Sequence, residues 1–206
     1  MSRLNQGLNS LFIHVPKAAG CSMSSVPWNK GNGHNTVSDF EAAGQLHPGL
    51  FVWAFVRNPW DRLAAAYEDC PEVWEEAPTF KSFVEKLRAS WSQVLDLKSV
   101  RFTKTPRLLS VGRIHFLPMH LLLRDSKGNL RPDYVGKVES LPASWDTLCI
   151  TLGVDPVKLP RHNSRQAKAS RRFTPTAALY DDRLANMVGD MFKADAELWG
   201  YTWPMI

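Results

Sequence analysis

Apolar residues gather in two short runs that favour buried strands. The first run covers residues 11–15, is interrupted only by His14 and stops at Pro16, and the second covers residues 51–56 and stops at Arg57. Continuous apolar runs of this length are typical of parallel strands that are covered on both faces of a sheet. The two runs therefore predict neighbouring parallel strands whose carboxyl ends lie at the same edge of the sheet.

Apolar residues spaced three and four apart predict helices along the rest of the chain. Asn58 is expected to cap a helix that begins at Pro59, because Asn is a favoured cap and Pro suits the first turn. Thr79 is expected to cap one long helix that reaches Leu95. Two further helices are predicted, one over residues 141–152 closed by Gly153 and a C-terminal one with Leu184, Met187, Val188 and Met191 on its apolar face.

The segment from His115 to Glu139 predicts an apolar strand, a turn over Ser126 to Asn129 and a second strand. Because strands alternate with helices, the predicted fold class is α/β, with a central, mainly parallel sheet flanked by helices. A ligand is then expected at the carboxyl ends of the strands. The chain has 206 residues, the size of one ordinary domain, so residues 1–206 are expected to form a single one.

Composition excludes several classes of protein. Lys and Arg number 25 against 20 Asp and Glu, a net charge of +5, which suits a polyanionic ligand but not nucleic acid, because no aromatic residues interleave with the charges. Three cysteines without CxxC spacing predict neither a disulfide framework nor a metal site, and they favour a reducing cytoplasm. The chain contains no apolar stretch of about 18 residues, so no signal peptide, membrane anchor or membrane partner is expected.

The first motif with chemical potential is FIHVPKAAGCSM, residues 12–23. A strand that runs through a loop of small residues into a helix presents backbone N–H groups to an anion. Lys17 would add a mobile positive charge, and Cys21 and Ser22 could add side-chain contacts. The loop is P-loop-like, but GxxxxGK[ST] is absent, so ATP hydrolysis is disfavoured. An ordinary strand-to-helix turn with a solvated lysine is the alternative.

The second motif is FVWAFVRNPWDRLAAAY, residues 51–67. Arg57 ends a buried strand and is therefore directed to the same edge as the first loop, with a planar guanidinium that suits phosphate. Two anion sites on one edge predict a ligand with two separated phosphates. The alternative is that Arg57 and Arg62 are structural charges that pair with Asp61 or Glu68, an interpretation that helix spacing favours for Arg62.

Together the two motifs resemble those of the sulfotransferases that use 3′-phosphoadenosine 5′-phosphosulfate (PAPS), especially the carbohydrate branch with bacterial relatives. The family's motifs run FIHIPKTGGTS and FVRNPYDRLVSAY. The segments HFLP, DYVGKVESL, LPRHNS and ALYDDRLANMVGDMFKADAELWGY are similar to further family segments in the same order, so the resemblance covers nearly the whole chain. It implies transfer of a sulfuryl group from PAPS to a hydroxyl of a small-molecule or carbohydrate acceptor, without a metal.

The resemblance also implies roles for individual residues. Lys17 would neutralise charge on the bridging oxygen as the S–O bond breaks, and Arg57 would bind the 3′-phosphate. Arg172, in the basic stretch 161–172, would fold over the nucleotide, although a solvated surface loop is the alternative for that stretch. The donor-binding residues so implied are Pro16, Lys17, Ala18, Ala19, Gly20, Cys21, Ser22, Arg57 and Arg172.

Five departures from the family pattern change a hydrogen-bonding side chain or a loop glycine. The two loop threonines are here Ala18 and Cys21, the first loop glycine is Ala19, the serine of the second motif is Ala65, and a glutamine is Met119. A lost hydrogen bond to a charged group costs about 1.5 to 3 kcal/mol, so donor affinity could fall tenfold or more. A catalytically impaired protein that binds PAPS or its desulfated product PAP is therefore the alternative function, against which the intact lysine and arginine count.

Transfer to a hydroxyl requires a base for the acceptor proton, and a histidine or a carboxylate is expected. His34 is the predicted base, because bacterial relatives carry a histidine in this region between the two motifs. His47 and His115 are the alternatives, and a solvated loop residue is the other interpretation of His34. His14, inside the first predicted strand, is predicted to be structural.

Overall fold

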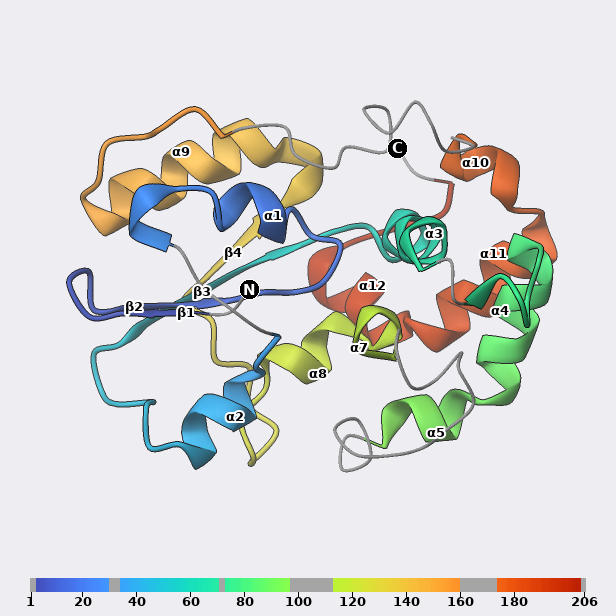
Figure 1. Ribbon diagram of the computed structural model, residues 1–206, viewed down its shortest axis with the longest axis horizontal. Helices are drawn as coiled ribbons and strands as arrows, with labels where there is room; N and C mark the ends of the chain where they lie inside the picture. Colours follow the sequence, from blue (N-terminus) through green and yellow to red (C-terminus); the bar gives the residue numbers. More distant parts are fainter. Residues whose placement is uncertain (1–2, 30–33, 71–72, 97–112, 160–173, 205–206) are drawn as a thin grey trace. The chain divides into compact units, whose positions relative to one another are not determined.

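The computed structural model describes residues 3–29, 34–70, 73–96, 113–159 and 174–204. Internal contacts divide the chain into two compact units, Met1–Arg57 with Met119–Lys168 and Asn58–Pro118 with Ala169–Ile206. The first unit holds the sheet, and the second is built from helices (Figure 1). The prediction of one domain over residues 1–206 stays a prediction, and each unit is described in turn.

The sheet of the first unit has four strands in the order β1-β2-β3-β4. Strand β2 pairs in parallel with β3, with Ser10 opposite Phe51 and Ile13 opposite Ala54, so the predicted neighbours are confirmed. β4 also runs parallel to β3, whereas β1 is antiparallel to β2. The strands are β1 (Arg3–Asn5), β2 (Ser10–Ile13), β3 (Phe51–Val56) and β4 (Tyr134–Lys137).

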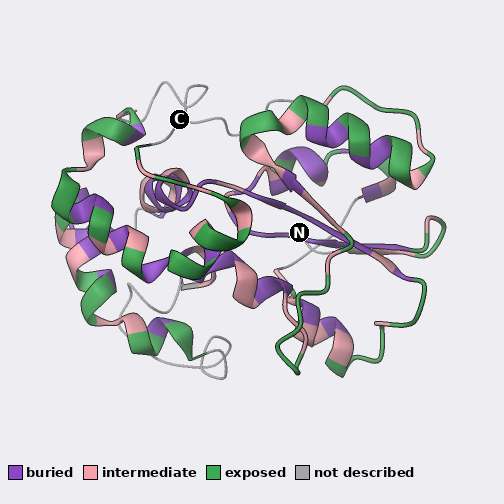
Figure 2. Cartoon of the chain, turned by 180° about the vertical axis from the view of Figure 1, so that it is seen from behind, coloured by how far each residue is buried: buried purple, intermediate pink, exposed green. Residues whose placement is uncertain are grey.

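Helices cover both faces of this sheet, as Figure 1 shows for α1 and α9 on one side and α2 and α8 on the other. The two central strands are buried (Figure 2), because covering both faces removes their side chains from water. The predicted α/β class with a mainly parallel sheet is therefore confirmed. The covering elements are α1 (Gly20–Met23), α2 (Val37–Ala42), α8 (Met119–Leu123) and α9 (Leu141–Leu152), with short 3₁₀ turns at Pro27–Asn29 and Val138–Ser140.

Strand β2 is shorter than predicted, because it ends at Ile13 and not at residue 15. The Ala18 N–H donates to the Val15 carbonyl at 3.2 Å, so the chain already turns at Val15 and leaves the ladder. Gly153 adopts φ 65° directly after α9, which confirms the predicted helix end, since glycine accepts the left-handed conformation without a steric penalty.

The strand predicted in the apolar segment near residue 120 is wrong, because the chain forms a helix there. Met119–Leu123 is α8, directly after Pro118, whose fixed φ suits the start of a helix. A short apolar run fits a buried strand and a buried helix equally well, so its pattern alone does not distinguish them. The predicted turn follows, with the Asp125 side chain accepting from the backbone N–H groups of Lys127 and Asn129.

The second unit is helical and begins with α3 (Pro59–Asp69), capped as predicted by the Asn58 side chain, which accepts from the Trp60 N–H at 3.0 Å. The predicted long helix after Thr79 is wrong, because Ser90, at φ −101° and ψ 14°, separates two helices. Thr79 does form the predicted cap. The remaining helices are α4 (Phe80–Ala89), α5 (Trp91–Leu95), α7 (Arg113–Phe116), α10 (Thr176–Leu179), α11 (Asp182–Met191) and α12 (Lys193–Trp199).

Helix α11 packs against α3 and α4 through its apolar face. Leu184, Val188 and Met191 are buried as predicted, and the Trp60 indole N–H donates to the Ala185 carbonyl at 2.8 Å. Burying these side chains is the main source of stability for such a helix, since short helices are marginal on their own. Across the described segments, every helix is too short or too polar to cross a membrane.

Candidate functional site

The loop between β2 and α1 carries an unusual backbone. Lys17 has φ 66° and Ala19 has φ 60°, a left-handed conformation that brings the Cβ of an L-residue close to the backbone. Each such residue costs about 1 kcal/mol or more, so the surrounding structure must hold the loop in place. Such strain is typical of functional sites, and here it falls in the predicted phosphosulfate loop.

The carboxyl ends of β2 and β3 meet at this loop. The Arg57 Nη1 donates to the Lys17 carbonyl at 3.1 Å, so the two predicted motifs lie at one edge of the sheet. A guanidinium has five N–H donors, and this bond is therefore compatible with further bonds to a phosphate. Two cationic side chains at the ends of adjacent parallel strands form an arrangement that suits a ligand with more than one anionic group.

The ring of His14 occupies the space beside Gly20. A Cβ on Gly20 would lie 1.7 Å from the His14 Nε2 and 1.9 Å from its Cδ2, so only glycine fits at this position. His14 is buried, at 8% exposure, and its ring stacks at 6.0 Å from that of Phe12. The first turn of α1 therefore sits directly on the imidazole.

His34 lies against the same strand end. Its ring centroid is 4.6 Å from that of His14, and the ring forms a hydrogen bond with the His14 backbone. Burial lowers the pKa of His34 below the usual 6.5, and nearby positive charge, including that of Lys17, lowers it further. The imidazole is therefore neutral at pH 7 and able to accept a proton.

The other two candidate bases are not brought to the loop by the first unit. His47 is exposed and precedes β3, so it lies at the amino end of a six-residue strand whose carboxyl end carries Arg57, about 20 Å away. His115 belongs to the second unit, where its Nδ1 lies 3.4 Å from the Cys70 Sγ. Of the three histidines considered, His34 is the one that the first unit brings to the loop.

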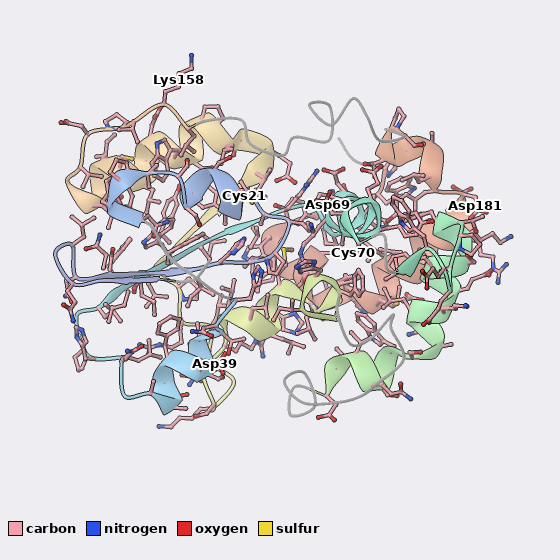
Figure 3. The ribbon with its side chains drawn as sticks, viewed as in Figure 1. Cys21, Asp39, Asp69, Cys70, Lys158 and Asp181 are labelled. Carbon is pink, nitrogen blue, oxygen red and sulfur yellow. The ribbon has the colours of Figure 1, made fainter. Side chains whose placement is uncertain are left out.

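The remaining predicted donor-binding residues differ in exposure. Pro16, Ala18 and Ser22 are buried, Ala19 is half-buried, and Cys21 is exposed on the single turn of α1 (Figure 3). The first group can contribute mainly backbone groups, whereas the Cys21 thiol is accessible. Arg172 and the basic stretch 161–172 lie outside the described residues.

Two residues have roles that the motifs alone did not define. Arg62 is buried and donates from Nη1 to the Leu117 carbonyl at 2.8 Å, which is a structural bond. His14 was predicted to be structural, yet it contacts both the loop and His34. A polar residue inside an otherwise apolar strand was the only signal for it. Among the described residues, no group of three or more His, Cys, Asp or Glu could hold a metal ion.

The fold is α/β, with Lys17 and Arg57 at one edge of the sheet, and comparison with protein families identifies the class. The chain matches the sulfotransferase family over residues 9–202. Because the match spans nearly the whole chain, the protein belongs to the sulfotransferase family and is a transferase, as its motifs predicted. Neither the curated proteins nor the solved structures contain a match to it.

Proposed function

We propose that this protein transfers the sulfuryl group of PAPS to an acceptor hydroxyl, with a carbohydrate as the expected acceptor class. Family membership supports sulfuryl transfer. The observation that carries the proposal is the bond from Arg57 to the Lys17 carbonyl, since PAPS has a 5′-phosphosulfate and a 3′-phosphate that need two anion sites close together. The acceptor class rests on the resemblance of the motifs.

The loop would bind the 5′ end of the donor. Backbone N–H groups from Ala19 to Ser22 would hold the phosphosulfate, because the N–H of Ala18 already donates to the Val15 carbonyl. Lys17 would neutralise the negative charge that develops on the bridging oxygen. Arg57 would bind the 3′-phosphate with its planar donor fork. Arg172 is assigned to the nucleotide by family resemblance alone.

His34 would act as the general base. As the acceptor oxygen forms its bond to sulfur and the S–O bond to the phosphate breaks, the neutral imidazole would take the acceptor proton and the leaving phosphate would keep the bonding electrons. No metal enters this scheme, because the loop amides and Lys17 supply the charge stabilisation. A base with a lowered pKa remains deprotonated at neutral pH, which suits this role.

A second candidate function is binding of PAP or PAPS without catalysis. Ala18, Cys21 and Ala65 stand where the family has hydroxyl side chains, and Ala18 and Ala65 are buried, so these contacts are lost without an evident substitute. The retained Lys17 and His34 favour catalysis. Turnover separates the two functions, because both bind the nucleotide.

The three cysteines, Cys21, Cys70 and Cys149, form no disulfide in the structure. Reduced cysteines are typical of a reducing compartment, so we propose a cytoplasmic location. Cell fractionation tests this directly, and recovery of the protein in a secreted or oxidised form would contradict it.

The decisive experiment is a thermal shift with PAP, followed by turnover with radiolabelled PAPS on a panel of glycans and small hydroxyl compounds. Ligand at 100 times its Kd stabilises a protein by about 2.7 kcal/mol, which is about 5 to 11 °C for a chain of this size. We expect a shift with PAP and a smaller one with AMP, which lacks the 3′-phosphate. No shift at millimolar PAP would exclude nucleotide binding, and a shift without turnover on any acceptor would support the second candidate.

A further inference from the structure

His14 contacts both halves of the proposed catalytic machinery. Its ring fills the position that a side chain on Gly20 would occupy, and its backbone holds the ring of His34. The rings of His14 and His34 also lie 4.6 Å apart. One residue therefore touches the donor loop on one side and the proposed base on the other.

We propose that His14 is a positioning residue, which sets the distance and orientation between the donor loop and His34. The inference rests on the proposed sulfuryl transfer, and it assigns His14 no contact with donor or acceptor. A base must lie within about 3 Å of the proton that it takes, and a displacement of about 1 Å can reduce the rate 100-fold. A shared support is a direct way to maintain that spacing.

The ring of His14 is itself held firmly. It follows β2, it is 8% exposed, and it stacks on Phe12, which in turn stacks on Trp53 at 4.3 Å. Aromatic pairs of this kind add to the stability of a core beyond the area that they bury. Stacking on Phe12 and, through it, on Trp53 connects the His14 ring to the sheet.

The shape of the imidazole matters more than its charge in this role. A planar ring fits between the Gly20 backbone and His34, whereas a methyl group would leave a cavity that both could move into. His14→Phe keeps a planar ring, and His14→Ala removes it. His47→Ala is the matched control, because His47 is exposed at the other end of the strands.

We expect His14→Ala to lower kcat about 10- to 100-fold and to weaken PAP binding less than about tenfold. His14→Phe should retain more than a third of kcat, and His47→Ala should match the parent protein. A general loss of folded protein would lower activity and PAP binding capacity together. The split between kcat and PAP affinity therefore distinguishes positioning from a merely structural role.

A second measurement does not depend on turnover. Burial is the main cause of the lowered pKa of His34, and positive charge, including that of Lys17, lowers the pKa further. Without the His14 ring, water reaches His34. The pKa of His34 measured by NMR should therefore rise toward 6.5 in His14→Ala. It should stay low in His14→Phe. This result is obtained even if no acceptor is found, so failure of the proposed function and failure of this inference are distinguishable.

The contact with Gly20 can be tested by complementation. Gly20→Ala alone places a methyl group inside the His14 ring and should lower the Tm and PAP affinity. The double variant His14→Ala with Gly20→Ala has room for that methyl group, so it should recover part of both losses. Gly7→Ala is the control, because its Cβ meets nothing closer than 3.5 Å.

The combined outcomes decide the inference. A kcat loss in His14→Ala, an upward shift of the His34 titration and recovery in the double variant would support it. Unchanged kcat with an unchanged His34 titration in His14→Ala would overturn it. If His14→Ala does not fold, His14→Phe and the double variant still decide, since additive losses in the double variant would also overturn it.

Discussion

Arg57 donates a hydrogen bond from Nη1 to the backbone carbonyl of Lys17 at 3.1 Å. The bond joins two residues that follow adjacent parallel strands. It also holds the carbonyl of Lys17, whose backbone is in the left-handed conformation at φ 66°. Arg57 therefore supports the donor loop as well as offering a cation to a phosphate. The two roles make different predictions for ligands with and without a 3′-phosphate.

Arg57→Ala should weaken PAP binding at least tenfold, because a charge-assisted hydrogen bond is worth about 1.5 to 3 kcal/mol. If Arg57 binds the 3′-phosphate, AMP affinity should change much less, since AMP lacks that group. Isothermal titration with both ligands measures this. Equal losses for PAP and AMP would instead make Arg57 chiefly a support for the loop.

Ala19→Gly should stabilise the protein by about 1 kcal/mol, because glycine adopts φ 60° without the steric cost that Ala19 bears. For a chain of this size the Tm should rise by about 2 to 4 °C. Ala18→Gly is the matched control, since Ala18 is buried and is not among the described residues with positive φ. Ala18→Gly should lower the Tm. A lower Tm for Ala19→Gly would contradict the strain assigned to the loop.

Lys17→Ala should lower kcat about 100- to 1000-fold, because its charge is needed most as the leaving phosphate becomes negative. PAP affinity should fall much less. Lys158→Ala is the control, since that lysine is exposed at the surface (Figure 3) and should be neutral. Kinetics with a saturating acceptor measure kcat, and titration with PAP measures the affinity. Equal losses in both would make Lys17 a binding residue only.

Ala65→Ser should tighten PAP binding up to about tenfold, by restoring the hydroxyl that the resemblance assigns to the 3′-phosphate. Ala64→Ser is the control, because Ala64 is its fully buried neighbour on α3 and should gain no affinity. PAP titration of both variants measures the difference. Unchanged affinity in Ala65→Ser would show that this hydroxyl has no role in this protein.

His34 should control the acid side of the pH profile. Because burial lowers the pKa of His34 below 6.5, turnover should stay high at pH 6.5 and fall only at lower pH, as the imidazole gains its proton. His34→Ala should lose most of the activity, whereas His47→Ala and His115→Ala should retain it. Retained activity in all three variants would assign the base to a carboxylate or remove the need for one.

The same group affects stability. His34 binds its proton less readily in the folded than in the unfolded chain, so protonation favours unfolding and stability falls as the pH drops below about 6.5. In His34→Gln this contribution is absent. The Tm of the variant should therefore decrease less between pH 7.5 and pH 5 than that of the parent. An equal decrease in both would show that other groups cause the acid sensitivity.

The sequence by itself determined the features that depend on local chemistry. The apolar run at residues 51–56 is the predicted strand β3 to the residue. Asn58 and Thr79 cap the starts of helices, and Gly153 ends one, as predicted. These features rest on run length, capping groups and backbone freedom, which neighbouring residues fix. The order of the motifs likewise sufficed to predict the family.

Tertiary structure decided what depends on contacts between distant residues. Residues 119–123 form a helix, because packing and the preceding proline decide between two states that an apolar run fits equally. The contacts of His14 with Gly20 and His34 link the end of a strand, the start of a helix and a loop. The spacing of apolar residues in the sequence does not predict such contacts. Only the folded chain brings these groups together, because their distances are set by side-chain packing and not by their spacing in the sequence.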